Sequence, residues 1–233
     1  MPVLKADLSA KRLRELAEAG LAVFCRQGYE RSQVADVAKA MGVAVGTVYL
    51  YVAGKEALFD LVVRHASAED PAWLDELEIP VQTPEPGSTV AFLKEVFDRT
   101  EWPKLEAALA IERAEDVAVE LHEVLREQYL LMRRHRQGLL LLMRSALEFP
   151  GLAGVFVMGL RARLLDHLSR YLSLRIKAGQ VREPEEIFAT AAVITQTISW
   201  ANLQRPLDPG LTMISEETAE TATIDLLVRG LLH

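Results

Sequence analysis

The sequence predicts an all-α protein with a small amino-terminal three-helix domain and a larger carboxy-terminal helical domain. Apolar residues recur at helical spacing in almost every segment of the 233-residue chain. Alternating β-branched runs joined by tight Asn-Gly turns, which would indicate strands, are absent. Half of the residues are hydrophobic and a quarter are charged, so the chain can form a core of ordinary size.

The first two helices are expected within residues 13–41. Residues 13–24 place apolar side chains on one face of a helix, and Gly28 suits the end of that helix. Ser32 is expected to cap a second, short helix that ends near Met41. The apolar residues of the first helix are Leu13, Leu16, Ala17, Leu21 and Phe24.

Residues 33–51 form a predicted helix-turn-helix. The turn Met41-Gly42-Val43 separates the second helix from a third, which is expected over residues 45–51. In such a unit the second helix braces against a DNA backbone, and the third presents its first residues to the major groove. A fourth helix over residues 55–67 is expected to connect this domain, residues 1–54, to a second domain, residues 55–233.

The carboxy-terminal part is expected to contain seven more helices. Four prolines, at positions 71, 80, 84 and 86, prevent a continuous helix, so residues 70–87 are either a domain boundary or a long ordered loop. The later helices are expected over residues 89–99, 103–114, 117–134, 136–147, 154–178, 184–203 and 215–232.

Charge and cysteine content narrow the possible functions. Residues 1–65 contain nine Lys and Arg against seven Asp and Glu, whereas the remainder contains 17 against 26. Only the amino-terminal quarter could therefore approach phosphate, and it would do so through a few placed contacts. Cys25 is the single cysteine, which excludes an intramolecular disulfide and a multi-cysteine zinc site. No signal peptide or membrane span is recognisable, so a cytoplasmic protein without a membrane partner is expected.

Residues 16–58 resemble the amino-terminal domain of TetR-family transcriptional regulators. Any one matching element would be unspecific, but the whole set at these spacings is specific. The remainder of the chain resembles the family only in helical content, in length and in the turn at residues 178–182. The matching elements are Phe24, Gly28-Tyr29, Val34, Asp36-Val37-Ala38, Gly42-Val43, Gly46-Thr47-Val48-Tyr49, Tyr51, Lys55-Glu56 and Leu58.

The resemblance implies DNA contacts for eight residues of this region. Gln33 would face a phosphate at the start of the second helix, and its backbone N–H would add a donor. The Tyr49 hydroxyl and the Lys55 amine would also bind phosphates. In the alternative interpretation, the three helices are only a scaffold and Tyr49 is a core aromatic residue. The implied contact residues are Gln33, Ala44, Val45, Thr47, Tyr49, Leu50, Tyr51 and Lys55.

Four of these residues, Ala44, Val45, Thr47 and Leu50, would face the bases and are called here the recognition surface. The family commonly has Ser or Thr where Ala44 stands, and a polar or basic residue where Val45 stands. Only Thr47 offers a hydrogen bond to a base edge, while the other three side chains can contact thymine methyl groups. The sequence therefore predicts modest direct readout, with DNA shape and backbone contacts carrying more of the specificity.

In the family, the larger domain binds a small molecule and forms a dimer through its last two helices. The resemblance therefore implies a homodimeric repressor on a palindromic operator, with its two recognition helices about 34 Å apart. A small-molecule effector would release the DNA by changing that separation. The expected interface stripes, which could alternatively face the protein's own core, are Phe188, Ala191, Ala192, Thr195, Ile198 and Ser199, with Ile224, Leu227, Val228 and Leu231.

An effector pocket requires apolar walls and a few polar groups. No cofactor is expected, and the Arg133-Arg134-His135-Arg136 run is most simply a solvated helix end. The principal candidates for the pocket are Trp102, Tyr129, Arg133, Phe156 and Trp200. Further candidates are Met132, Phe149, Met158, His135, Arg144, Asn202 and Gln204.

Two other classes of function stay open at this point. An all-helical enzyme is disfavoured, because the sequence contains no HExxH, P-loop, GxGxxG or Gly-x-Ser-x-Gly motif and no i, i+4 histidine pair. A helical adaptor that binds protein and has lost specific DNA binding is the other alternative, since Ala44 and Val45 are apolar.

Overall fold

The computed structural model describes residues 2–68, 70–146, 148–149 and 151–233, and these residues form an all-α protein, as predicted. Among them, the single strand-like pairing is an isolated parallel bridge between Val52 and Val81. The chain divides into two compact units. The first comprises Met1–Asp98 and Gln137–Phe156, and the second comprises Arg99–Arg136 and Val157–His233.

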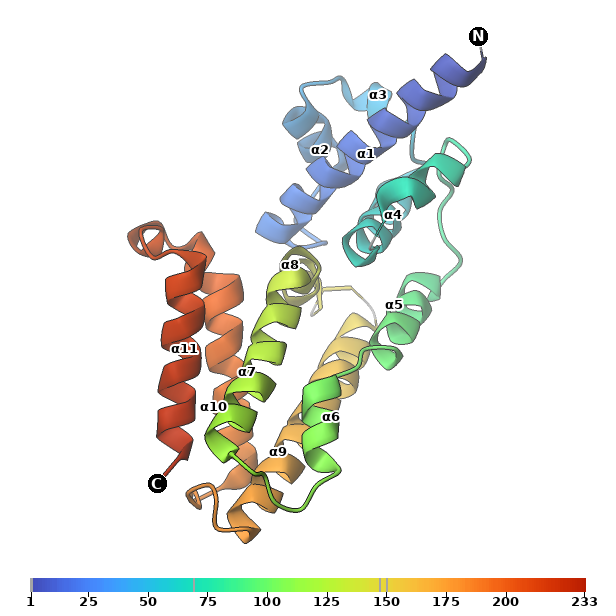
Figure 1. Cartoon of the computed structure of the whole chain (residues 1–233). Coiled ribbons are helices and arrows are strands. Elements are labelled where there is room, and N and C mark those ends of the chain that lie inside the picture. Colours follow the sequence, from blue (N-terminus) through green and yellow to red (C-terminus); the bar gives the residue numbers. More distant parts are fainter. Residues whose placement is uncertain (1, 69, 147, 150) are drawn as a thin grey trace. The chain divides into compact units, whose positions relative to one another are not determined.

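The first unit is built around the long amino-terminal helix α1. Helix α2 and α4 both pack against α1, and α3 packs against α2 (Figure 1). The apolar face predicted for α1 is buried, from Leu13 to Phe24. The helices of this unit are α1 (Pro2–Gln27), α2 (Val34–Met41), α3 (Val45–Val48), α4 (Lys55–Ser67), the 3₁₀ helix η1 (Pro71–Glu76), α5 (Ser88–Asp98) and α8 (Arg136–Ser145).

The start of α2 differs from the prediction. Gln33, not Ser32, occupies the N-cap position. The Ser32 hydroxyl instead donates a hydrogen bond of 2.6 Å to the Gly28 carbonyl and is fully buried. The Gln33 backbone N–H donates to the Asp36 carboxylate at 2.8 Å. The Asp36 carboxylate in the first turn of α2 thus accepts a hydrogen bond from the backbone N–H of the N-cap residue.

The proline-containing segment is an ordered loop of the first unit. The Val81 N–H donates to the Tyr51 carbonyl at 2.8 Å, and the Ala53 N–H donates to the Val81 carbonyl at 2.9 Å. This loop therefore braces the chain directly after α3. The boundary between the two compact units differs from the domain boundary expected after residue 54. The first unit continues beyond that residue, because α4 packs on α1 and α5 packs on α4. A functional boundary after residue 54 stays a prediction.

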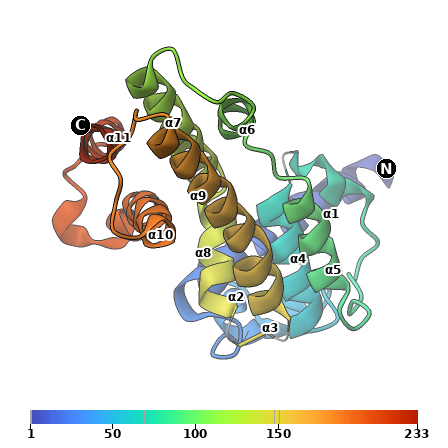
Figure 2. The ribbon, with the colours of Figure 1, turned by 90° about the horizontal axis from the view of Figure 1, so that it is seen from below.

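The second unit is a helical bundle, in which α10 packs against α9 and α11 packs against α7. Figure 2 shows α10 and α11 side by side. The π-helical segment η2 (Gly154–Arg161) carries the chain from the first unit into the second. The helices of the second unit are α6 (Pro103–Leu109), α7 (Val117–Arg134), α9 (Ala162–Lys177), α10 (Ile187–Ser199), the π-helical η3 (Trp200–Gln204), the 3₁₀ helices η4 (Arg205–Leu207) and η5 (Pro209–Leu211), and α11 (Glu216–Leu231).

A buried arginine connects three helices of this bundle. Arg175 on α9 is fully buried and contacts both carboxylate oxygens of Glu120 on α7, at 2.6 and 2.9 Å. It also donates to the carbonyls of Ala108 and Ile111, at 2.7 and 3.0 Å. Those carbonyls lie where α6 ends, and their bonds to Arg175 replace the helical bonds that a longer α6 would supply. The helix predicted over residues 103–114 accordingly stops at Leu109.

The apolar stripes expected at a dimer interface are largely part of the protein's own core. Ala191 and Ile198 on α10 are fully buried, and Ile224 on α11 is 1% exposed. For these three residues the interface assignment is therefore wrong, and the alternative, that they face the core, is confirmed. The large apolar side chains that α10, η3 and α11 leave exposed are Phe188, Val193, Trp200 and Leu226.

Among the described residues, no helix has both the length and the apolar character that crossing a bilayer requires.

Candidate nucleic-acid interface

Helix α3 and the turn that follows it present three large side chains to solvent. Val45, Tyr49 and Leu50 are 40%, 49% and 67% exposed, respectively. Val48 is fully buried and anchors the helix in the core of the first unit. Exposed apolar and aromatic residues in so short a segment are unusual for a scaffold, because burial of such side chains would stabilise the fold. Tyr49 is thus not a core aromatic residue, contrary to the scaffold interpretation.

The turn before α3 depends on a glycine. Gly42 adopts a left-handed conformation with φ of 68°, and the Val43 N–H closes the turn on the Ala38 carbonyl at 3.0 Å. A residue with a Cβ is strained in this conformation. The turn therefore fixes the direction in which α3 leaves α2.

Helix α3 is shorter than predicted. Regular helix covers Val45–Val48, and the chain continues in a looser turn in which the Tyr51 N–H donates to the Val48 carbonyl at 2.9 Å. Ala44 occupies the N-cap position without a side-chain cap. Gly46 further lowers the helix propensity, so the segment has little intrinsic tendency to extend. Its conformation depends on Val48 and on the loop that holds Tyr51.

The expected phosphate contacts outside α3, Gln33 at the start of α2 and Lys55 at the start of α4, lie in two different settings. Gln33 is exposed, as a phosphate contact would require, but its backbone N–H is occupied by Asp36. The expectation that this N–H is a free donor is therefore wrong. Lys55, at the start of α4, donates to the Glu30 carbonyl at 3.1 Å and lies 4.3 Å above the Tyr29 ring. An ammonium group has three donors, so two remain for a phosphate.

The side of Tyr29 away from solvent belongs to an aromatic cluster. Tyr29 lies 4.8 Å from Phe59 and 4.9 Å from Phe149, measured between ring centroids, and Phe24 contacts Phe59 at 5.2 Å. Phe149 is one of the further candidates for the effector pocket, but its ring packs against residues of the first unit instead. The Lys55 side chain thus rests on an aromatic platform that includes a residue from beyond α8.

Glu148 holds the turn between α1 and α2. Its carboxylate accepts a hydrogen bond from the Glu30 backbone N–H at 3.1 Å. Gly28 lies against it so closely that a Cβ there would stand 2.5 Å from a Glu148 oxygen and 2.9 Å from the Arg144 carbonyl. Sequence reasoning missed Glu148, because a contact between residues 118 positions apart leaves no local pattern.

The residues expected to bind an effector do not form one cluster. Trp102 and Tyr129 are buried in the core of the second unit, while Trp200 is 44% exposed. Phe156 belongs to the first unit and contacts Phe97. Arg133 is half-buried and paired with Glu220. Large aromatic residues usually fill cores, and that structural role accounts for Trp102 and Tyr129.

Comparison with known proteins places residues 16–62 in a sequence family. This segment matches the model of the family described as bacterial regulatory proteins, tetR family. The fatty acid metabolism regulator protein of Bacillus subtilis (strain 168) is 45% identical over 42 residues, which are 18% of this chain and 22% of that protein. The chain thus matches about a fifth of the length of this curated relative.

Three solved structures share the fold over nearly the whole chain. The ketosteroid regulator KstR2 of Mycobacterium tuberculosis is 15% identical with a TM-score of 0.53, covering 95% of each chain. The TetR-family regulator PfmR of Thermus thermophilus is 17% identical with a TM-score of 0.53, covering 94% of this chain and 96% of its own. AibR, solved with isovaleryl coenzyme A and operator DNA, is 15% identical with a TM-score of 0.53, covering 93% and 98%.

These similarities agree with the geometry. The family segment spans α2, the Gly42 turn, the exposed helix α3 and the start of α4, so it contains the candidate interface. The solved structures extend the fold similarity to the second unit. The family consists of regulatory proteins, which agrees with the expectation that the chain is not an enzyme. Residues 16–62 are thus similar to the TetR family of bacterial regulatory proteins, and the chain as a whole shares the fold of the three solved regulators.

Proposed function

We propose that this protein is a homodimeric transcriptional repressor that binds a palindromic operator and is released by a small-molecule effector. The observation that carries the proposal is the exposed surface of α3 and of the turn after it within the family segment, where Val45, Tyr49 and Leu50 face solvent. A regulator of this kind works in the bacterial cytoplasm, where its operator lies.

The recognition surface would read its site mainly through apolar contacts. Ala44, Val45 and Leu50 are exposed and can contact thymine methyl groups, while the half-buried Thr47 supplies a hydroxyl. The Tyr49 hydroxyl and the free donors of Lys55 would bind phosphates. We therefore expect an operator with defined thymine positions and without a strongly specified guanine in each half-site.

DNA selection on the purified protein tests the proposed function. A randomised duplex library should yield a palindromic sequence, with half-sites spaced so that the two recognition helices enter successive major grooves. Selection that enriches no palindrome, while the protein is folded, would favour a helical adaptor over a DNA-binding regulator.

The homodimer is proposed to form through the exposed surface of the last two long helices. Val193 on α10 is 61% exposed and Leu226 on α11 is 68% exposed, and Trp200 adds a large apolar surface. Exposed apolar side chains of this size on neighbouring helices are typical of a surface that another chain covers. Phe188, a member of the predicted stripes, is also exposed at 54%, so it stays a candidate, whereas the buried Ala191, Ile198 and Ile224 do not.

Val193→Asp should convert the dimer to a monomer. A buried carboxylate without a partner is costly, and twofold symmetry would place two of them in one interface. Light scattering coupled to size-exclusion chromatography measures the mass directly. Val119→Asp is the matched control, since Val119 on α7 is 55% exposed. The proposed interface would be wrong if both variants kept the mass of the native dimer.

The effector is proposed to act on the second unit. AibR, which shares the fold, has been solved with isovaleryl coenzyme A and operator DNA, and the matched Bacillus subtilis protein regulates fatty acid metabolism by its name. Acyl-coenzyme A thioesters are therefore the first compounds to test. A coupling of about 1–3 kcal/mol between effector and operator is the expected range for such a switch.

A further inference from the structure

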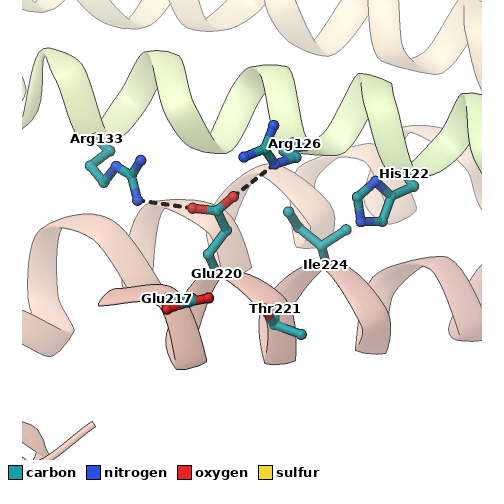
Figure 3. Close-up of a pocket in the computed structure, with 7 residues that line it drawn as sticks. All are labelled: His122, Arg126, Arg133, Glu217, Glu220, Thr221 and Ile224. Carbon is teal, nitrogen blue, oxygen red and sulfur yellow. Dashed lines mark hydrogen bonds and ion pairs between the residues drawn. The ribbon is translucent and has the colours of Figure 1, made fainter. Parts of the chain in front are cut away.

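A polar groove of about 410 Å³ lies in the second unit between α7 and α11. Its α7 side carries basic groups, and its α11 side carries carboxylates and a small apolar floor (Figure 3). The exposed apolar side chains of the proposed dimer surface are not among the residues that line the groove. Its lining residues are His122, Arg126, Arg133, Glu217, Glu220, Thr221 and Ile224.

One carboxylate bridges the two arginines of this groove. Arg126 contacts one oxygen of Glu220 through its Nε at 2.9 Å, and Arg133 contacts the other oxygen through a terminal nitrogen at 2.9 Å. Figure 3 shows Glu220 between the two guanidinium groups. The Glu220 side chain is only 13% exposed, whereas those of Arg126 and Arg133 are 52% and 38% exposed. Both arginines therefore remain accessible from the groove.

Each guanidinium group keeps a pair of donors that Glu220 does not use. Arg126 engages Glu220 through Nε, which leaves its two terminal nitrogens. Arg133 engages Glu220 through one terminal nitrogen, which leaves the other together with Nε. Among the described residues, neither arginine has a further hydrogen-bond partner. A planar pair of N–H donors matches the two oxygens of a carboxylate or a phosphate.

The surroundings of the groove add positive charge. Beside it, Glu216 is bound by Arg136 and Arg205, each at 2.7 Å, and these bonds hold the pKa of Glu216 below its usual value. The groove and these three neighbouring residues together contain four arginines and three glutamates.

The buried Tyr129 lies on the same face of α7, about one turn from each groove arginine, and its hydroxyl has no partner among the described residues. Burial raises the pKa of Tyr129, so this hydroxyl stays protonated and can donate.

We propose that this groove binds a small organic anion, a carboxylate or a phosphate, through the unused donors of Arg126 and Arg133. Glu220 holds both side chains in place and competes with the anion for them. His122 and Thr221 lie beside the bound group, and Ile224 supplies an apolar contact. Binding of the anion at this groove does not require DNA binding, so an experiment can refute the anion site without refuting the proposed DNA-binding function, and the reverse.

Calorimetric titration at constant ionic strength tests this site, with inorganic phosphate and succinate as probes. We expect one of the two probes to bind saturably to the native protein. Arg133→Gln should lower the affinity for that probe about tenfold, because a charged partner and its hydrogen bonds are lost. Glu220→Gln should bind several-fold more tightly, since the competing charge is removed. Arg229→Gln is the matched control: Arg229 lies on α11, its side chain is 83% exposed, and the charge change is the same.

The outcomes separate a specific site from general charge effects. Equal weakening by Arg133→Gln and Arg229→Gln would show that only net charge matters and would overturn the proposal. Weaker binding by Glu220→Gln, or no saturable binding of either probe to the native protein, would also overturn it. Near-ultraviolet circular dichroism establishes that each variant is folded, and Glu220→Gln keeps the site testable if Arg133→Gln does not fold.

Discussion

Arg175→Met should lower the free energy of unfolding by about 3–5 kcal/mol, the range observed when one partner of a buried ion pair is removed. The substitution leaves the Glu120 carboxylate without its cation, and it also strands the carbonyls of Ala108 and Ile111. The Tyr171 hydroxyl, which donates to Glu120 at 3.0 Å, cannot compensate for a lost positive charge. Chemical denaturation monitored by circular dichroism measures this loss.

Two further variants make the Arg175 result specific. Arg170→Met, on the same helix, removes a guanidinium that is 63% exposed and pairs with Asp166 only at 3.9 Å, so it should cost about 0–1 kcal/mol. The double variant Arg175→Met with Glu120→Gln should recover part of the loss, because the isolated carboxylate is gone. Equal stabilities of Arg175→Met and Arg170→Met would contradict the structural role of this network.

Gly28→Ala should be the second most damaging change, and Gly42→Ala is its matched control. Both glycines adopt a left-handed conformation, with φ of 78° and 68°. That conformation alone costs a residue with a Cβ about 1–2 kcal/mol. A Cβ at position 42 meets nothing within 4 Å, whereas at position 28 it would collide with Glu148 and the Arg144 carbonyl. We expect Gly28→Ala to cost a further ~1–3 kcal/mol, as overpacking does.

The difference between the two glycine variants measures how tightly Arg144 and Glu148 contact the turn after α1. Gly28→Ala should also weaken DNA binding, because Lys55 rests on Tyr29 and Glu30 in the same turn. Denaturation curves for both variants, analysed with a common slope, give the comparison directly. A Gly28→Ala variant as stable as Gly42→Ala would indicate that Glu148 does not hold this turn.

Local patterns in the sequence were sufficient to predict where most helices lie, though not the ends of α3 and α6, and to predict the position of the candidate interface. The period of apolar residues marked the buried face of α1, and the turn at Gly42 marked the step from α2 to α3. These features depend on neighbours within a few residues, so they leave a readable trace. Helix α7 was predicted with its observed bounds for the same reason.

Contacts between distant residues could not be predicted in this way. The hydrogen bond from Glu30 to Glu148 and the aromatic contact of Phe149 with Tyr29 join segments far apart in the chain. A stripe such as Ala191 and Ile198 looks the same whether it faces its own core or a partner. The early end of α6 reflects Arg175, which lies on another helix. In each case tertiary structure, not local propensity, decided the outcome.

Leu50→Asp tests directly whether the exposed surface of α3 and the turn after it binds DNA. Leu50 is 67% exposed on the recognition surface, so the substitution should leave the fold intact while placing a carboxylate against the bases. Each of two recognition helices would lose about 1–3 kcal/mol, which weakens binding by about 30-fold or more. Met213→Asp, at an 89% exposed side chain, is the control. Fluorescence anisotropy with the selected operator should show this loss for Leu50→Asp alone; equal affinity for native protein and Leu50→Asp would contradict the claim.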